Sequence, residues 1–164
     1  MKKLRSIEIN IHAQSSLSSY YRQAIKTSAQ LTIDSIPKNT FLKMTQGISK
    51  GLISVAVVGP KAIHKLNLKY RFKDKPTDVL SFSRMELGLL ILPNSPTDLG
   101  DVILCWKIVN KQAREYGTSV REEISRLTVH GVLHLFGYDH ETNQREANKM
   151  FSLQNKIMRT LFRK

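Results

Sequence analysis

The stretch that decides the fold reads Leu52-Ile53-Ser54-Val55-Ala56-Val57-Val58-Gly59-Pro60. Its first seven residues are nearly all apolar and rich in β-branched side chains, which is typical of a strand buried on both faces of a sheet. The Gly-Pro pair ends that strand. Pro60 suits the first turn of a helix, which we predict to run to about Tyr70. A central strand leading into a helix indicates a domain of mixed secondary structure.

Predicted helices and strands alternate along the chain before and after this strand. Residues 6–12 alternate polar and apolar side chains, which predicts a half-buried strand, and Ser119 with Glu122 forms a capping-box pattern that opens a helix. The other predicted elements are strands at 79–83 and 101–106, helices at 15–31, 107–116, 119–136 and 143–161, a connection at 34–47 with at most a short helical piece, and a loop or irregular edge at 85–98. We therefore expect an α+β fold: a single domain over residues 1–164, with a small central mixed sheet of about four strands flanked by helices.

The composition is that of a globular domain. The chain has 164 residues, of which 41% are hydrophobic and 24% are charged. The lone cysteine, Cys105, excludes an intramolecular disulfide, so we expect a reducing, cytoplasmic location and a Cys105 that packs as a small buried hydrophobe. No stretch approaches about 18 consecutive apolar residues, so no membrane-spanning helix is expected.

The net charge of +13 is the first indication of function. Residues 1–82 carry 14 basic and 4 acidic side chains, whereas residues 83–164 carry 12 and 9. A positive field attracts polyanions and steers their approach. Nucleic acid is the first candidate partner and an anionic membrane surface is the second.

Three of the five histidines lie within the predicted helix 119–136 and just after it: His130, His134 and His140. The first two are four residues apart, so both rings lie on one helix face. Gly137 allows the chain to leave the helix, and the turn then carries His140 back toward that face. Three imidazoles suit a tetrahedral zinc ion whose fourth position stays open, as in catalytic sites. We therefore predict a zinc site on a helix and the following turn.

The histidine spacing resembles the metzincin protease motif H-E-x-x-H-x-x-G-x-x-H, except that Gly131 stands where the general-base glutamate belongs. Glu123, seven residues before His130, is either a partner of the metal ligands or a solvated acid at the helix start, and we favour the second. Asp139 is expected to form the turn and Tyr138 to pack.

A second informative stretch, residues 66–82, alternates cations and aromatic side chains around a turn. Arginine forks suit phosphate oxygens, lysines track a nucleic-acid backbone, and aromatic rings offer stacking faces for unpaired bases. The candidate RNA-binding residues are Lys69, Arg71, Lys73 and Lys75. A solvated basic loop is the alternative interpretation of this stretch.

Together these segments resemble the YbeY family of single-strand-specific endoribonucleases of ribosomal RNA maturation. The matching blocks are Leu66-Asn67, Tyr70-Arg71, Asp74-Lys75-Pro76-Thr77-Asp78-Val79-Leu80-Ser81-Phe82, Leu99-Gly100-Asp101-Val102, His130-Gly131, Leu133-His134-Leu135 and Gly137-Tyr138-Asp139-His140. The resemblance is close over about residues 50–142. The family often has proline after Ser81-Phe82, where Ser83 stands here, and serine where Cys105 stands.

The resemblance implies one zinc ion held by His130, His134 and His140, and a functional arginine at Arg71. It implies action on single-stranded ribosomal RNA in the small subunit, notably at the 16S 3′ end, and in ribosome quality control. A ribosome-assembly GTPase and a small-subunit ribosomal protein are the suggested partners, with no membrane association. The sequence leaves the oligomeric state open, and also the choice of zinc over nickel or cobalt.

As a mechanism, we expect Arg71 to neutralise charge on the reacting phosphate and His134 to be required for both metal binding and cleavage. The nucleophile, zinc hydroxide or the RNA 2′-OH, and the general base stay unassigned. Asp78 and Asp101 either line the cleft or serve turn and strand-end structure. Two other functions stay open: a metzincin-like metalloprotease, and a non-catalytic ribosome-associated RNA-binding protein with structural zinc.

Overall fold

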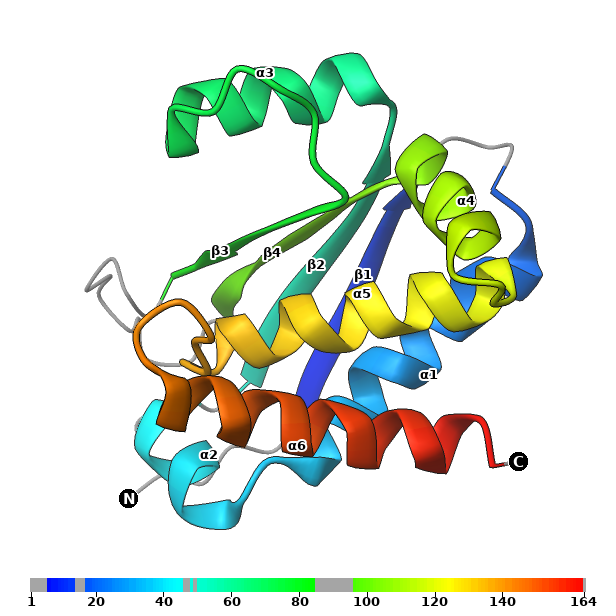
Figure 1. The fold of residues 1–164 in the computed structure, drawn as a ribbon. Helices are drawn as coiled ribbons and strands as arrows, with labels where there is room; N and C mark the ends of the chain where they lie inside the picture. Colours follow the sequence, from blue (N-terminus) through cyan, green and yellow to red (C-terminus); the bar gives the residue numbers. More distant parts are fainter. Residues whose placement is uncertain (1–5, 14–16, 46–47, 49, 85–95, 164) are drawn as a thin grey trace.

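The computed structural model describes residues 6–13, 17–45, 48, 50–84 and 96–163, and Figure 1 shows their arrangement. The elements in chain order are β1 (Ser6–Ala13), α1 (Ser19–Ser35), α2 (Lys38–Met44), β2 (Lys50–Val58), α3 (Pro60–Arg71), β3 (Val79–Ser83), β4 (Thr97–Cys105), α4 (Trp106–Glu115), α5 (Val120–Leu135) and α6 (Gln144–Leu161). The predicted α+β fold with four strands is confirmed.

The sheet is mixed, with strand order β1-β2-β4-β3. The pairs β1–β2 and β2–β4 are parallel, whereas β3 pairs with β4 in the antiparallel sense. The deciding stretch is central as predicted: Ile53 and Val55 of β2 are fully buried between two neighbouring strands.

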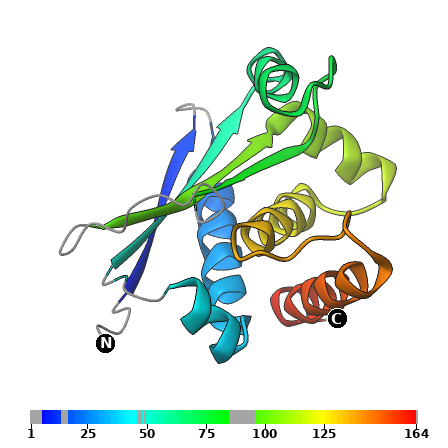
Figure 2. The same ribbon diagram turned by 90° about the vertical axis from the view of Figure 1, so that its left-hand side faces the viewer.

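The helices lie in layers against the sheet. Figures 1 and 2 show α1 and α5 against one face, with α6 outside α5. The main core fills the space between the sheet and the helices α1 and α5. A second cluster joins α5 to α6 and consists of Val129, Leu133, Met150 and Ile157. On the other side, α3 packs through Ile63 against Leu80 of β3. The central helix α5 is therefore enclosed, and its C-terminal end is held in a fixed place.

Some predicted boundaries are wrong. Trp106 is the first residue of α4 rather than the last of a strand, and α1 extends to Ser35. Residues 97 and 98, predicted as loop, begin β4 because Thr97 pairs with Gly51 in the sheet. Residues 85–95 of the predicted loop lie outside the described residues. The short helical piece predicted within 34–47 is confirmed as α2.

Cys105 is a fully buried free thiol at the end of β4, as predicted. It packs with Ile63 and Leu80 in the small cluster under α3. None of the helices in the described part of the chain is long and apolar enough to cross a membrane.

Candidate active site

Helix α5 and the turn after it bring the three histidines together. The predicted capping box fixes the start of α5: the hydroxyl of Ser119 accepts from the amide of Glu122, and the glutamate carboxylate accepts from the amide of Ser119. Gly137 takes a left-handed conformation (φ 77°) after the helix end, which glycine adopts without steric cost. Asp139 then forms the predicted turn, because its carboxylate accepts from the Glu141 amide.

The geometry of this histidine cluster (His130, His134 and His140) fits a metal ion. One ring nitrogen from each residue lies within 4.8 Å of the others. The Nε2 atoms of His130 and His134 are 3.2 Å apart. Two nitrogen ligands of a tetrahedral zinc ion are about 3.3 Å apart when each Zn–N bond is about 2.05 Å. The three imidazoles could therefore hold a metal ion, and the His130–His134 pair has the spacing of two ligands on one ion.

Burial keeps the two helix histidines uncharged. Desolvation, followed by repulsion from the neighbouring His134, lowers the pKa of His130 to about 4. Desolvation also lowers the pKa of His134, and the charges of His140 and Arg71 act in the same direction. Both imidazoles are therefore neutral at pH 7, the form that donates a lone pair to a metal.

Helix α6 supports the cluster with two side chains that the sequence analysis missed. Oε1 of Gln154 accepts a hydrogen bond of 3.0 Å from Nδ1 of His130, which leaves Nε2 of that ring free as a ligand. One turn earlier, the ring of Phe151 stacks on His140 with centroids 5.5 Å apart. Gln154 interrupts the apolar face that Met150 and Ile157 form on α6, and this polar interruption is the signal that could have revealed it.

The expectation that Glu123 is a solvated helix-start acid is wrong. Its side chain is only 2% exposed, and both carboxylate oxygens accept from Arg126, at 2.6 and 3.0 Å. Glu123 lies on the face of α5 that packs in the interior, so its carboxylate needs a partner there. Glu123 is also outside the histidine cluster, as far as the described side chains show. Tyr138 packs against both core clusters, as expected.

The histidine cluster opens into a pocket of about 540 Å³ that three cations also line. These pocket cations are Arg71, Lys73 and Lys75. Nη2 of Arg71 donates to the carbonyl of Ser81 at 3.4 Å. Lys69, predicted with the others, is outside this pocket lining, and its Nζ lies 5.0 Å from the centre of the Tyr70 ring.

Asn67 holds the segment that carries the pocket cations. It is 2% exposed, its Nδ2 donates to the carbonyl of Lys75 at 2.7 Å, and its carbonyl accepts from the amide of Lys73 at 3.3 Å. Satisfied buried hydrogen bonds of this kind fix a loop in one conformation. The side chain of Asn67 thus gives Lys75 a defined place at the pocket, and its backbone carbonyl does the same for Lys73.

Asp78 and Asp101 differ in their position relative to the pocket. Asp78 lines the pocket, but its carboxylate already accepts from the Val79 amide at 2.9 Å and from Nε2 of Gln112 at 3.0 Å. Asp101 is outside the pocket lining and pairs with Arg84 at 3.1 Å. Burial and the nearby charge of Asp98 raise the pKa of Asp101. Asp78 therefore has both a structural role and access to the pocket, whereas Asp101 has a structural role.

Gly131 explains why the metzincin glutamate is missing. A Cβ atom at this position would lie 2.5 Å from Cγ1 of Val102 and 3.1 Å from the hydroxyl oxygen of Ser81. Residue 131 therefore faces the sheet, and a glutamate side chain has no room there. This geometry argues against the metalloprotease alternative.

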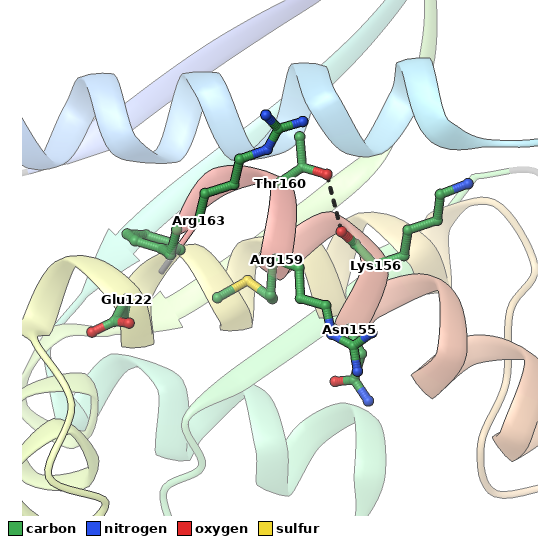
Figure 3. A pocket seen from close by; sticks show the side chains of 8 residues that line it. Glu122, Asn155, Lys156, Arg159, Thr160 and Arg163 are labelled. Carbon is green, nitrogen blue, oxygen red and sulfur yellow. Dashed lines mark hydrogen bonds between the residues drawn. The ribbon is translucent and has the colours of Figure 1, made fainter.

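A larger cavity of about 720 Å³ lies elsewhere, beside the C-terminal part of α6 (Figure 3). It is lined by Glu122 together with Lys156, Arg159 and Arg163, and none of its lining residues is a histidine. Size alone therefore does not identify the active site. The smaller pocket is the candidate because it combines metal-type ligands with cations.

Comparisons with known proteins show which family the chain resembles. A family model described as Endoribonuclease YbeY matches residues 10–162. A protein named Endoribonuclease YbeY from Bdellovibrio bacteriovorus is 34% identical over 143 residues, 87% of this chain and 88% of that protein. One of the same name from Bacillus licheniformis is 42% identical over 123 residues, 72% of this chain and 77% of that protein. The solution structure of a Thermotoga maritima protein matches with a TM-score of 0.57 and 27% identity, covering 93% of this chain and 87% of that one.

Proposed function

The chain belongs to the Endoribonuclease YbeY family, and on this basis we propose that it cleaves single-stranded ribosomal RNA at the histidine cluster. One observation carries the proposal: three imidazole ligands and three cations line the same pocket. Metal ligands beside cations suit a phosphodiester, which brings negative charge to the reacting atoms. A peptide substrate would give these cations no role.

His130, His134 and His140 would hold one zinc ion per chain. Zinc bound in this way supplies Lewis acidity toward a phosphoryl oxygen. The role of the chain is to present three imidazoles in fixed positions, with the His130 ring oriented by Gln154.

Arg71 is the catalytic residue that we assign to charge stabilisation. It lines the pocket, and its charge already acts on His134 and lowers the pKa of that ring. A guanidinium in this place can donate to the phosphate oxygens that gain charge during cleavage. Lys73 and Lys75 would hold the neighbouring phosphates of the strand, and Lys69 would contribute from outside the pocket.

The family membership suggests the biological setting. We propose that residues 1–164 act as one hydrolase domain in the cytoplasm, on the 3′ end of 16S ribosomal RNA and in ribosome quality control. The partners would be the small ribosomal subunit, a ribosome-assembly GTPase and a small-subunit ribosomal protein.

The test is cleavage of a single-stranded RNA carrying a 16S 3′-end precursor by wild type, His134→Ala and Arg71→Ala. We expect both variants to lose cleavage, with metal content lost only in His134→Ala. Arg114→Ala, an exposed arginine of α4 outside the pocket, is the matched control and should cleave normally. Equal cleavage by all four proteins would mean contaminating ribonuclease and would refute the proposal. Tight RNA binding without metal-dependent cleavage would favour the binding-protein alternative.

A further inference from the structure

Phe72 lies between two pocket cations, Arg71 and Lys73, yet its side chain is 89% exposed. The nearby aromatic side chains behave differently: Tyr70 and Phe82 pack edge to face with ring centroids 5.1 Å apart. In the described part of the chain, Phe72 makes no comparable ring contact. At this exposure the ring contributes little to the core and is accessible to a ligand.

The backbone of Phe72 is also unusual. It ends α3 in the left-handed conformation (φ 56°, ψ 28°), and it is the one non-glycine residue with positive φ among those the structure describes. Its amide donates to the carbonyl of Leu68, and the next amide donates to the carbonyl of Asn67. Glycine or asparagine normally occupies such a helix end, because a bulky side chain is disfavoured there. Phe72 therefore neither contributes much to the core nor favours the left-handed backbone conformation at the end of α3.

The surroundings of the ring indicate what it contacts. Consecutive Cα atoms are about 3.8 Å apart, so the ring emerges within one residue of a cation on each side. Asp74 is the single acidic residue in 69–77, and its carboxylate is engaged by His64 at 2.7 Å. An exposed aromatic ring among cations is how proteins bind unpaired nucleic-acid strands: the cations contact phosphates and the ring stacks on a base.

We propose that Phe72 stacks on an unpaired base of the RNA strand, next to the phosphates that Arg71 and Lys73 contact. This inference rests on the proposed function and adds a base-contacting site beside these two cations, since Phe72 itself is not among the residues that line the pocket. Stacking on a phenyl ring tolerates every base, so the contact selects unpaired RNA rather than a particular sequence.

The first test separates base contacts from phosphate contacts. Two single-stranded chains of equal length and charge are compared, one RNA with bases and one abasic, with binding read by stopped flow before cleavage. Phe72→Asn removes the ring, and asparagine tolerates the left-handed backbone, so the fold is kept. We expect this variant to bind RNA on the order of 5- to 150-fold more weakly than wild type does. The variant and the wild type should bind the abasic chain with the same affinity. Lys73→Ala should weaken binding to both chains.

The second test observes stacking directly. The F72W variant places an indole at the site, and its fluorescence should be quenched by RNA but not by the abasic chain. The matched control is Y116W, at an exposed position at the end of α4 outside the pocket, which should respond to neither. If Phe72→Asn prefers RNA over the abasic chain as strongly as wild type does, the stacking site is wrong. Binding of both chains without any cleavage would instead refute the proposed function and leave the stacking result interpretable.

Discussion

At the scale of single residues, the histidine cluster depends on Gln154 as much as on its own spacing. Gln154 is buried, and its Oε1 atom accepts a hydrogen bond from Nδ1 of His130. This hydrogen bond fixes the tautomer of the ring, so that Nε2 faces His134. Outer partners of metal-binding histidines commonly change metal affinity by about 10- to 100-fold.

We predict that Gln154→Leu lowers zinc affinity by about 10- to 100-fold, because the His130 ring loses its orienting acceptor. The measurement is competition for zinc with a chromophoric chelator. Gln154→Glu keeps an acceptor and should retain affinity, and Asn155→Leu, at the exposed neighbouring position, controls for an added leucine on α6. Unchanged affinity in Gln154→Leu would show that the hydrogen bond does not serve the metal.

Gly131 supports a second prediction at this scale. Gly131→Ala should destabilise the fold by about 1–3 kcal/mol, because its Cβ would overlap Val102. Denaturant unfolding measures the change. In the double variant with Val102→Ala the penalty of the alanine should shrink, which a double-mutant cycle detects. Strict additivity of the two substitutions would contradict the overlap.

The sequence analysis named the three histidines that cluster and all three pocket cations, but it also named Lys69, which is outside the pocket lining. It could not predict Gln154 or Phe151, because they belong to a helix separate from α5 and reach the site only through the packing of α6 on α5. The error at Glu123 has the same origin: the burial of its side chain depends on neighbours distant in sequence.

At the scale of elements, local signals determined most of the secondary structure. The capping box at Ser119, the proline at the start of α3 and the Gly137 turn are all confirmed. Strand order and direction were not predictable in this way, because β2 pairs with β4 rather than with the next strand in sequence. The extent of β4 was missed because its first residues are polar and become strand only by pairing with β2.

The capping box yields a prediction for the helix that carries the histidines. Ser119→Ala should lower the free energy of unfolding by about 1 kcal/mol, because the amide of Glu122 loses its acceptor. Urea unfolding measures this change. Ser152→Ala, at an exposed position inside α6, should change stability little. A loss for Ser152→Ala equal to that for Ser119→Ala would exclude a capping effect.

At the scale of the whole molecule, part of the positive charge meets the histidine cluster at one pocket. The amino-terminal half of the chain carries the larger excess, and three of its cations line the pocket that holds the histidine cluster. Neither periodicity nor charge could predict that these two distant segments meet, although the family resemblance implied it. Here α3 and the following turn bring the cations to the end of α5.

The salt dependence of RNA binding tests this arrangement. Each phosphate contact on a single strand adds about 0.7 to the slope of log affinity against log salt concentration. We predict that Lys73→Ala and Lys75→Ala each reduce that slope by about 0.7, since each removes one contact. Lys26→Ala removes an exposed lysine of α1 outside the pocket and should leave the slope unchanged. Equal effects at all three positions would indicate a diffuse field instead of a pocket.

The most direct measurement is a zinc titration of the metal-free protein with RNA cleavage followed at each addition. If the histidine cluster holds the metal needed for cleavage, the rate should rise in proportion to zinc and stop rising at one ion per chain. His140→Ala should shift the titration to much higher zinc concentrations. Cleavage by the metal-free protein at the full rate, or a rate that does not follow zinc, would contradict the account.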